Sequence, residues 1–246
     1  MPENTLRLYP FHADKIAGAP HEDLAFGPPE SRYPSRPYVI INMVSSVDGK
    51  VVMEGKASRI GSETDRRAMR TLRSKADAVM IGASTLRAEK LSLGLDDHGP
   101  QPLAVIATRT GDLPLENLIV GEHQDVLVLT TNDAPKSLDG RLRERARVLR
   151  VTATPPGGIN LEEALEVLKI EYAIEVLLVE GGPRLNYALI CEDLADELFL
   201  TLAPKLLGGT VDEILTVLDG PALQRRKIKL LSAHLAEDEL FLRYSL

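Results

Sequence analysis

The sequence contains a single cysteine, Cys191, in 246 residues. One thiol excludes an internal disulfide and a cysteine-based metal cluster, and it fits a reducing compartment, so we expect a cytoplasmic protein. Tryptophan is absent, and aromatic residues amount to 4% of the chain. Because proteins that bind single strands stack the bases on aromatic side chains, this scarcity argues against a nucleic-acid partner.

Long apolar runs are also missing. No segment approaches the roughly 18 apolar residues of a membrane span, and no basic stretch followed by an apolar one opens the chain, so neither a membrane partner nor a secretory signal is expected. The net charge of −7 gives no support for nucleic acid or an anionic membrane as the main partner. The five histidines share no metal-ligand spacing, so we expect no metal site.

The remaining composition, 44% hydrophobic and 26% charged, is ordinary for a globular protein. The chain is long enough for one large domain or two small ones. Residues 1–36 are rich in proline and polar residues and are expected to form an N-terminal arm or extended lead-in. Its apolar segment Leu6–Phe11 is the part expected to dock on the rest, and residues 37–246 are expected to form one domain.

From Tyr38 onward, short β-rich segments alternate with segments of helical periodicity, which predicts an α/β protein. We expect strands at 38–46, 77–82, 102–109, 125–131, 147–153, 175–182 and 196–204, and helices at 62–76, 84–90, 138–146, 161–170 and from 184. Ser62 and Asn160 are expected to cap two of these helices. Residues 227–246 predict an antiparallel hairpin beside a mostly parallel sheet. Parallel sheets bind ligands outside the carboxyl ends of their strands, so the strand ends hold the candidate residues.

One strand end is unusually bare. The sequence VLLVEGGPRLN places Gly181 and Gly182 after a buried strand and Pro183 in the first turn of a helix. Without side chains there, a ligand can approach the backbone amides, and the helix start directs free N–H groups at a phosphate. Glu180 would then accept hydrogen bonds from an amide- or amine-bearing ligand. The alternative is a tight strand-to-helix turn with a solvated Glu180, and the residues alone leave both open.

A second strand ends in the same way at Gly82, with Ser84 and Thr85 near the start of the next helix. Each corner alone is more typical of a plain helix cap. Two such corners in one sheet favour a cofactor with two phosphates, or with a phosphate and a ring.

Other strand ends carry polar side chains. Asp48, followed by Gly49, is an acceptor or proton relay in the functional interpretation and a simple Asp-Gly turn otherwise. Arg59 could reach an anionic substrate. Thr108, Arg109 and the pair Thr130–Thr131 could hold a ribose 2′-phosphate, since the guanidinium fork matches phosphate oxygens.

Several longer pieces are more specific together than any one residue: NMVSSVDGK, SRIGSETD, LRSKADAVMIGASTLRAE, LLVEGGPRLN, DELFLTLAPKLLGG and LSAHLAEDELFLRYSL. On these pieces the chain resembles the riboflavin-pathway pyrimidine reductase family, the reductase half of the bifunctional deaminase–reductase. The resemblance implies a dihydrofolate-reductase-like fold over residues 37–246, NADPH as hydride donor and a homodimer. It also implies reduction of the ribosyl group of an aminopyrimidinone 5′-phosphate to ribityl.

The resemblance and the strand-end pattern together define three sets of candidate residues. Asp48 and Glu180 are the candidate catalytic residues. Cofactor contacts are expected from Gly82, Thr85, Glu89, Thr108, Arg109, Thr130, Gly181, Gly182, Pro183, Arg184 and Leu185. Substrate contacts are expected from Asn42, Ser58, Arg59 and Arg73.

One segment departs from the family pattern. Many members continue after the Gly82 helix into Asp-Asp-Pro-x-Leu-Thr and a phosphate-binding arginine, whereas this chain has Glu89, Leu91 and Asp96 at these places. A carboxylate near a phosphate would repel it. Two alternatives therefore stay open: a divergent dihydrofolate- or dihydropteridine-type reductase, and a nucleotide-binding protein without chemistry.

Overall fold

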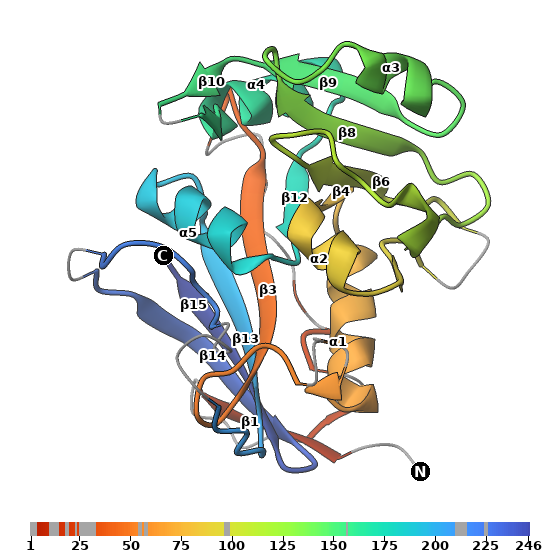
Figure 1. Cartoon of the computed structure of the whole chain (residues 1–246). Coiled ribbons are helices and arrows are strands. Elements are labelled where there is room, and N and C mark those ends of the chain that lie inside the picture. The colour runs from red at the N-terminus through yellow and green to blue at the C-terminus, as the bar shows by residue number, and fades with distance from the viewer. Residues whose placement is uncertain are drawn as a thin grey trace. The chain divides into compact units, whose positions relative to one another are not determined.

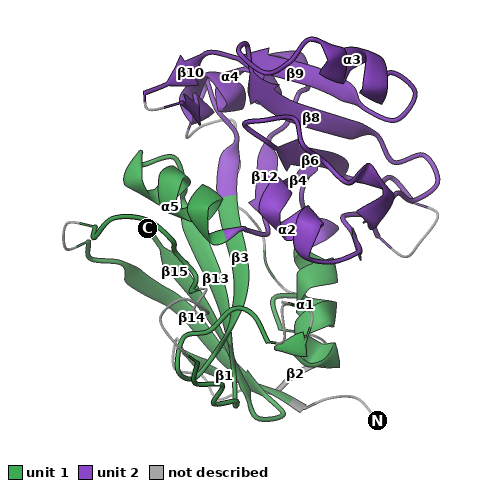
Figure 2. Ribbon diagram, viewed as in Figure 1, with its two compact units in different colours: residues 1–25, 40–72, 183–246 green, residues 26–39, 73–182 purple. Residues whose placement is uncertain are grey.

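The computed structural model describes residues 4–9, 15–17, 20–22, 24, 33–53, 56, 59–95, 99–155, 157–209, 216–223 and 226–246. Ser58 and Asp96, both singled out from the sequence, lie outside these ranges. The chain divides into two compact units, shown in different colours in Figure 2. Unit 1 comprises Met1–Ala25, Ile40–Leu72 and Pro183–Leu246, and unit 2 comprises Phe26–Val39 and Arg73–Gly182.

Unit 2 is built on parallel strands. Within its described residues they follow the order β12 (Val176–Val179), β4 (Ala78–Gly82), β6 (Leu103–Ala107), β8 (Val126–Thr131) and β9 (Arg147–Val151). All residues of β6, β8 and β12 are buried, as expected of apolar strands covered on both faces. The carboxyl ends of these strands therefore share one edge of the sheet.

Helices connect the strands of unit 2 (Figure 1). They are α2 (Ala83–Ala88), α3 (Ser137–Leu142), α4 (Leu161–Glu171) and the short 3-10 helix η3 (Leu115–Asn117). The unit also contains two small strand pairs: β5 (Leu91–Ser92) pairs with β7 (Leu118–Ile119), and β10 (Ala153–Thr154) pairs with β11 (Gly158–Ile159). Asn160 caps α4 as predicted, because its side chain accepts a bond from the Glu163 N–H at 3.1 Å. Helix α3 is shorter than predicted, because the N–H groups of Arg145 and Ala146 both bond to the Leu142 carbonyl and close a turn before β9.

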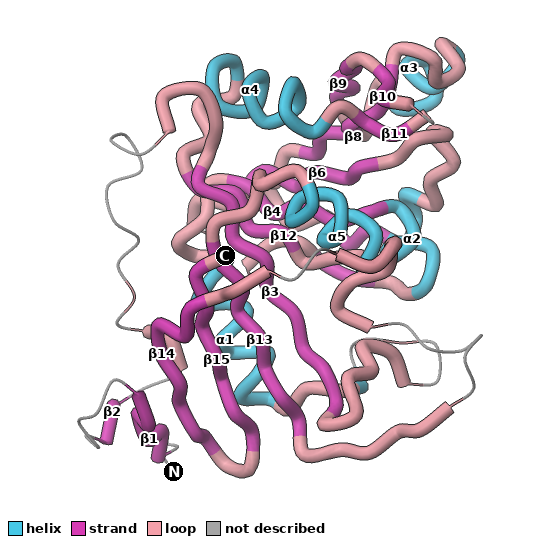
Figure 3. The backbone as a smooth tube through the Cα atoms, turned by 90° about the vertical axis from the view of Figure 1, so that its left-hand side faces the viewer, coloured by secondary structure: helices cyan, strands magenta, loops and turns pink. Residues whose placement is uncertain are grey.

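Unit 1 contains the predicted hairpin. Its described strands follow the order β2 (Lys15–Ala17), β1 (Asn4–Tyr9), β14 (Lys229–Ala236), β15 (Glu239–Ser245), β13 (Glu197–Ala203) and β3 (Tyr38–Ser46), with β3 entering the unit at Ile40. Figure 3 shows β14, β15 and β13 side by side. Only the pair of β13 and β3 is parallel; the other described pairs are antiparallel. The expected α/β fold with a parallel sheet and an antiparallel C-terminal hairpin is confirmed.

The N-terminal segment adds strands to this sheet. In β1, Leu6 lies opposite Leu235 of β14. Helices α1 (Glu63–Arg73) and α5 (Pro183–Cys191) complete the regular structure of the described chain, α1 passing into unit 2 at Arg73. The Ser62 hydroxyl accepts the Asp65 N–H at 3.2 Å, which confirms the predicted cap of α1. Among the described residues, no helix has the length and apolar character that crossing a membrane requires.

Candidate active site

The two glycine corners predicted from the sequence lie next to each other in unit 2. Strands β4 and β12 are neighbours in the sheet. The Gly82 N–H bonds to the Gly181 carbonyl at 2.9 Å, and the Glu180 N–H bonds to the Met80 carbonyl at 2.9 Å. The ladder between the strands thus continues into the glycine turn and fixes it against the start of α2.

The geometry of this corner explains why its backbone is bare. Gly181 has φ +91°, a conformation that side chains disfavour, and the Gly181–Gly182 peptide is cis. A Cβ on Gly182 would lie 3.1 Å from the Thr85 Oγ1 and 3.3 Å from the Ser84 Oγ. The missing side chain at Gly182 therefore lets the turn pack closely on α2, in addition to any approach by a ligand.

Glu180 and Arg73 form a buried ion pair. The Arg73 Nε donates to the Glu180 Oε1 at 2.8 Å and its Nη2 donates to the Oε2 at 2.7 Å. The side chains are only 7% and 10% exposed. The third Arg73 contact runs from Nη1 to the Gly94 carbonyl at 2.9 Å, in the segment that departs from the family pattern. The sequence placed both residues on the substrate side but did not indicate that they bind each other.

Among the remaining candidates of unit 2, Thr108 and Arg109 follow β6, Thr130 lies within β8, and Glu89 follows α2. The Thr108 hydroxyl accepts the Gly111 N–H at 3.1 Å, and Thr130 is fully buried. The Arg109 side chain is exposed, and the Glu89 N–H bonds to the Thr85 carbonyl at the end of α2. Their contacts to a cofactor stay predictions, and Arg109 is more accessible than Thr108 or Thr130.

The start of α5 belongs to unit 1 and is held by a later segment. The exposed Arg184 forms an ion pair with Asp219 at 2.8 Å, and the Asp219 N–H bonds to the Pro183 carbonyl at 3.2 Å. Leu185 is half-buried in the same turn. Asn186, which the sequence did not single out, is fully buried and donates to the Val217 carbonyl at 3.1 Å.

Asp48 organises the other candidate region of unit 1. Its carboxylate accepts the Ser46 hydroxyl at 2.6 Å, the Leu207 N–H at 3.2 Å and the Gly208 N–H at 2.7 Å. These bonds, led by that of Ser46 and then that of Gly208, lower the pKa of Asp48 to about 2. The carboxylate is therefore ionised at neutral pH, which suits a hydrogen-bond acceptor better than a proton donor.

Lys205 fixes the backbone at Arg59. Its Nζ donates to the Arg59 carbonyl at 2.9 Å and to the Ile60 carbonyl at 2.6 Å. The Arg59 residue is exposed, whereas Asn42 is half-buried in β3, where it lies opposite Phe199 of β13. The substrate roles of Arg59 and Asn42 stay predictions.

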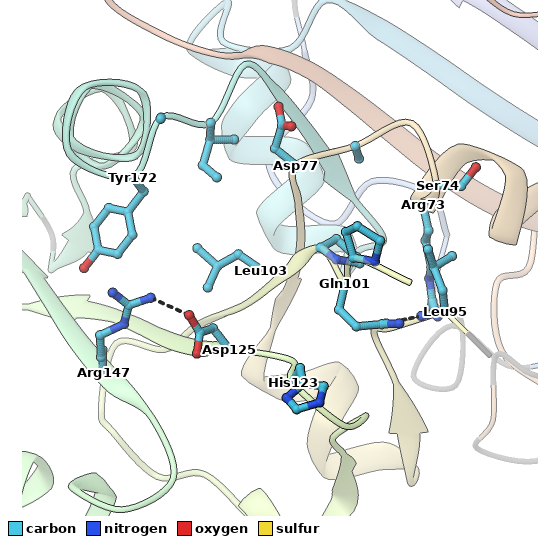
Figure 4. A pocket seen from close by; sticks show the side chains of 15 residues that line it. Arg73, Ser74, Asp77, Leu95, Gln101, Leu103, His123, Asp125, Arg147 and Tyr172 are labelled. Carbon is cyan, nitrogen blue, oxygen red and sulfur yellow. Dashed lines mark hydrogen bonds and ion pairs between the residues drawn. The ribbon is translucent and has the colours of Figure 1, made fainter. Parts of the chain in front are cut away.

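A pocket of about 500 Å³ lies elsewhere in unit 2 (Figure 4). It is found where β4, β6 and β9 begin, at the edge opposite the glycine corner, and Asp77, Leu103 and Arg147 contribute to its wall. An ion pair of 3.1 Å joins Arg147 to Asp125 at its rim. Of the predicted site residues that the structure describes, only Arg73 lines this pocket. No group of three acidic, histidine or cysteine side chains suited to a metal ion occurs in the described parts of the chain.

Parallel strands that end in a glycine corner, together with a C-terminal antiparallel hairpin, define a dihydrofolate-reductase-like α/β protein. The profile of the RibD C-terminal domain matches residues 37–238, and the chain belongs to this family. It is 29% identical to the 2,5-diamino-6-ribosylamino-4(3H)-pyrimidinone 5′-phosphate reductase of Methanothermobacter thermautotrophicus, over 85% of this chain and 98% of that protein. The reductase of the same name from Archaeoglobus fulgidus is 31% identical, over 78% of this chain and 90% of its own length.

A solved structure supports the same assignment. RibD of Acinetobacter baumannii, form 1, superposes with a TM-score of 0.68 at 25% identity. The match covers 88% of this chain and 60% of the RibD chain. The similarity thus extends over most of this chain and over part of a longer protein.

Proposed function

We propose that this protein is an NADPH-dependent reductase that converts the ribosyl group of an aminopyrimidinone 5′-phosphate to ribityl in riboflavin biosynthesis. The observation that carries the proposal is the alignment with two relatives named as reductases of 2,5-diamino-6-ribosylamino-4(3H)-pyrimidinone 5′-phosphate, over 98% and 90% of their lengths. The reaction class is oxidoreduction, and the substrate is a small phosphorylated heterocycle.

The residues around the glycine corner fit a dinucleotide. Gly82 and Gly182 carry no Cβ, and the proposal is that a phosphate approaches the backbone beside them, although the Gly82 N–H itself is bonded to the Gly181 carbonyl. The proposal assigns this role also to Thr85 and Glu89 of the adjacent helix and to the start of α5. The exposed Arg109 is assigned the 2′-phosphate that distinguishes NADPH from NADH. When bound, NADPH supplies the hydride, and the protein binds and orients both molecules.

Glu180 is assigned to the heterocycle. An ionised carboxylate offers about four lone-pair positions, and Arg73 uses one on each oxygen, so acceptor capacity is left for the amino groups of a pyrimidine. Because Arg73 holds both oxygens, the carboxylate is already oriented before substrate binds. Arg59 is assigned to the substrate phosphate, with Asn42 and Ser58 as further substrate contacts.

The decisive experiment follows NADPH oxidation by the purified chain with three acceptors: the aminopyrimidinone 5′-phosphate, dihydrofolate and a dihydropteridine. Turnover with the pyrimidine, and a higher kcat/KM with NADPH than with NADH, is expected. Turnover with dihydrofolate or the dihydropteridine alone would assign the chain to a divergent reductase. NADPH binding without oxidation of any acceptor would make it a non-catalytic nucleotide-binding protein.

The proposal includes a cytoplasmic homodimer, in line with the single cysteine and with the family resemblance. Light scattering coupled to size-exclusion chromatography tests the assembly. We expect twice the mass of the 26.9 kDa chain, and a monomer at micromolar concentration would contradict this part of the proposal.

A further inference from the structure

Two exposed aliphatic side chains stand at the exits of a parallel strand pair in unit 1. Strands β3 and β13 pair in parallel up to Ser46 and Ala203. Val47 follows β3 and is 57% exposed, and Leu206 follows β13 and is 78% exposed. Exposed aliphatic groups at the carboxyl ends of parallel strands occupy the edge where α/β proteins bind ligands.

Hydrogen bonds fix the backbone at Val47 and on both sides of Leu206. The Val47 N–H bonds to the Lys205 carbonyl at 2.9 Å. The Asp48 carboxylate holds the amides of Leu207 and Gly208, and the Lys205 ammonium holds the carbonyls of Arg59 and Ile60. Leu206 thus lies between two anchored residues, and its exposure does not come from a loosely attached loop.

The hydrogen bonds of Asp48 indicate what it does. Both carboxylate oxygens accept bonds from the protein, from a hydroxyl on Oδ1 and from backbone amides on Oδ1 and Oδ2. Gly208 donates the shortest of the amide bonds and has φ +62°, a backbone conformation that favours glycine. The carboxylate therefore shapes the 205–208 segment.

We propose that Val47 and Leu206 form an apolar wall for the planar pyrimidine ring of the substrate, and that Asp48 is a positioning residue that holds this wall through Leu207 and Gly208. The inference rests on the proposed function. A pyrimidine with amino and carbonyl substituents needs polar partners at its edge, whereas its face is best covered by aliphatic groups.

The first test measures KM, kcat and the NADPH dissociation constant for Leu206→Ala and Val47→Ala, with Ile228→Ala as a control. Ile228 is also an exposed aliphatic residue of unit 1, at 44%, but lies before β14. Loss of the apolar contact is expected to raise the substrate KM about 5- to 20-fold per variant and to leave NADPH affinity within about twofold. Ile228→Ala should behave as the unmodified protein. An unchanged KM in both wall variants, in an enzyme that reduces the pyrimidine, would overturn the wall.

The second test compares Asp48→Asn with Ser46→Ala, which removes one hydrogen bond from the same carboxylate. If Asp48 positions the wall, both variants raise the substrate KM, by about 10-fold or more for Asp48→Asn, and neither moves the pH profile of kcat. If Asp48→Asn abolishes kcat at unchanged KM while Ser46→Ala has no effect, Asp48 is a catalytic residue and the positioning role is wrong. Absence of pyrimidine turnover in the unmodified protein would refute the proposed function itself, a separate outcome.

Discussion

At the scale of single residues, the Arg73–Glu180 pair joins two candidate site residues in one buried interaction. Taking two charges out of water is costly, and the pair offsets this through its two-pronged geometry and the additional bond to Gly94. The pair joins the end of α1 to the exit of β12 beside the glycine corner. A substitution of Arg73 should therefore lower the free energy of unfolding. Under the proposed function it should also weaken substrate binding.

Replacing Arg73 by methionine is expected to lower the free energy of unfolding by about 3–5 kcal/mol, because Glu180 would be left as a buried charge without its partner. Urea denaturation measures the loss. The control is Arg147→Met, which breaks the Arg147–Asp125 pair of the same unit, whose side chains are 59% and 76% exposed. That variant should lose less than about 1 kcal/mol. Equal losses in the two variants would show that the burial of the Arg73 pair has no energetic consequence.

At the scale of elements, the sequence was informative where signals are local. The alternation of residues 227–246 predicted the hairpin, and Ser62 and Asn160 were identified as caps from their position before a helical segment. The contacts within the candidate site were not predicted, because they join residues far apart in the chain. Arg73 and Glu180 are 107 residues apart, and Asp48 and Gly208 are 160 apart. No local pattern indicates such pairs.

Glycine-to-alanine substitutions at two positions, Gly181 in the glycine corner and Gly140 in α3, are expected to change stability in opposite directions. Gly181→Ala is expected to destabilise the protein by about 1–2 kcal/mol, because alanine is disfavoured at the observed φ of +91°. It should also weaken NADPH binding, since the corner is assigned to the phosphates. Gly140→Ala should instead stabilise it by about 0.5–1 kcal/mol, because Gly140 lies inside α3 and a methyl group added there would meet open space. Thermal unfolding and NADPH titration of both variants provide the test, and a destabilised Gly140→Ala would contradict it.

At the scale of the whole molecule, a histidine from the N-terminal segment enters the core of unit 1. His21 is 3% exposed and packs edge-on against Phe199 at 4.8 Å and His234 at 5.3 Å between ring centroids. Burial, followed by the nearby His234 and Arg243, lowers the pKa of His21 from 6.5 to about 3. Arg243 of β15 is paired with Glu197 of β13, so these two groups face the cluster as an ion pair. The folded chain thus favours the neutral form of His21.

The consequence is a loss of stability in acid. Between pH 6.5 and 3 the unfolded chain binds a proton at His21 that the folded chain does not, so stability is fully present above pH 6.5 and falls as the pH decreases, by up to about 1.4 kcal/mol per pH unit. Urea unfolding from pH 7 to 4 measures how the free energy of unfolding depends on pH. In His21→Leu the slope of this free energy against pH should be shallower by the equivalent of about one bound proton. His123→Leu is the matched control, because His123 also has a positive φ, +63° against +70°, and its side chain is 86% exposed. If His21→Leu keeps the original slope, another group causes the acid sensitivity.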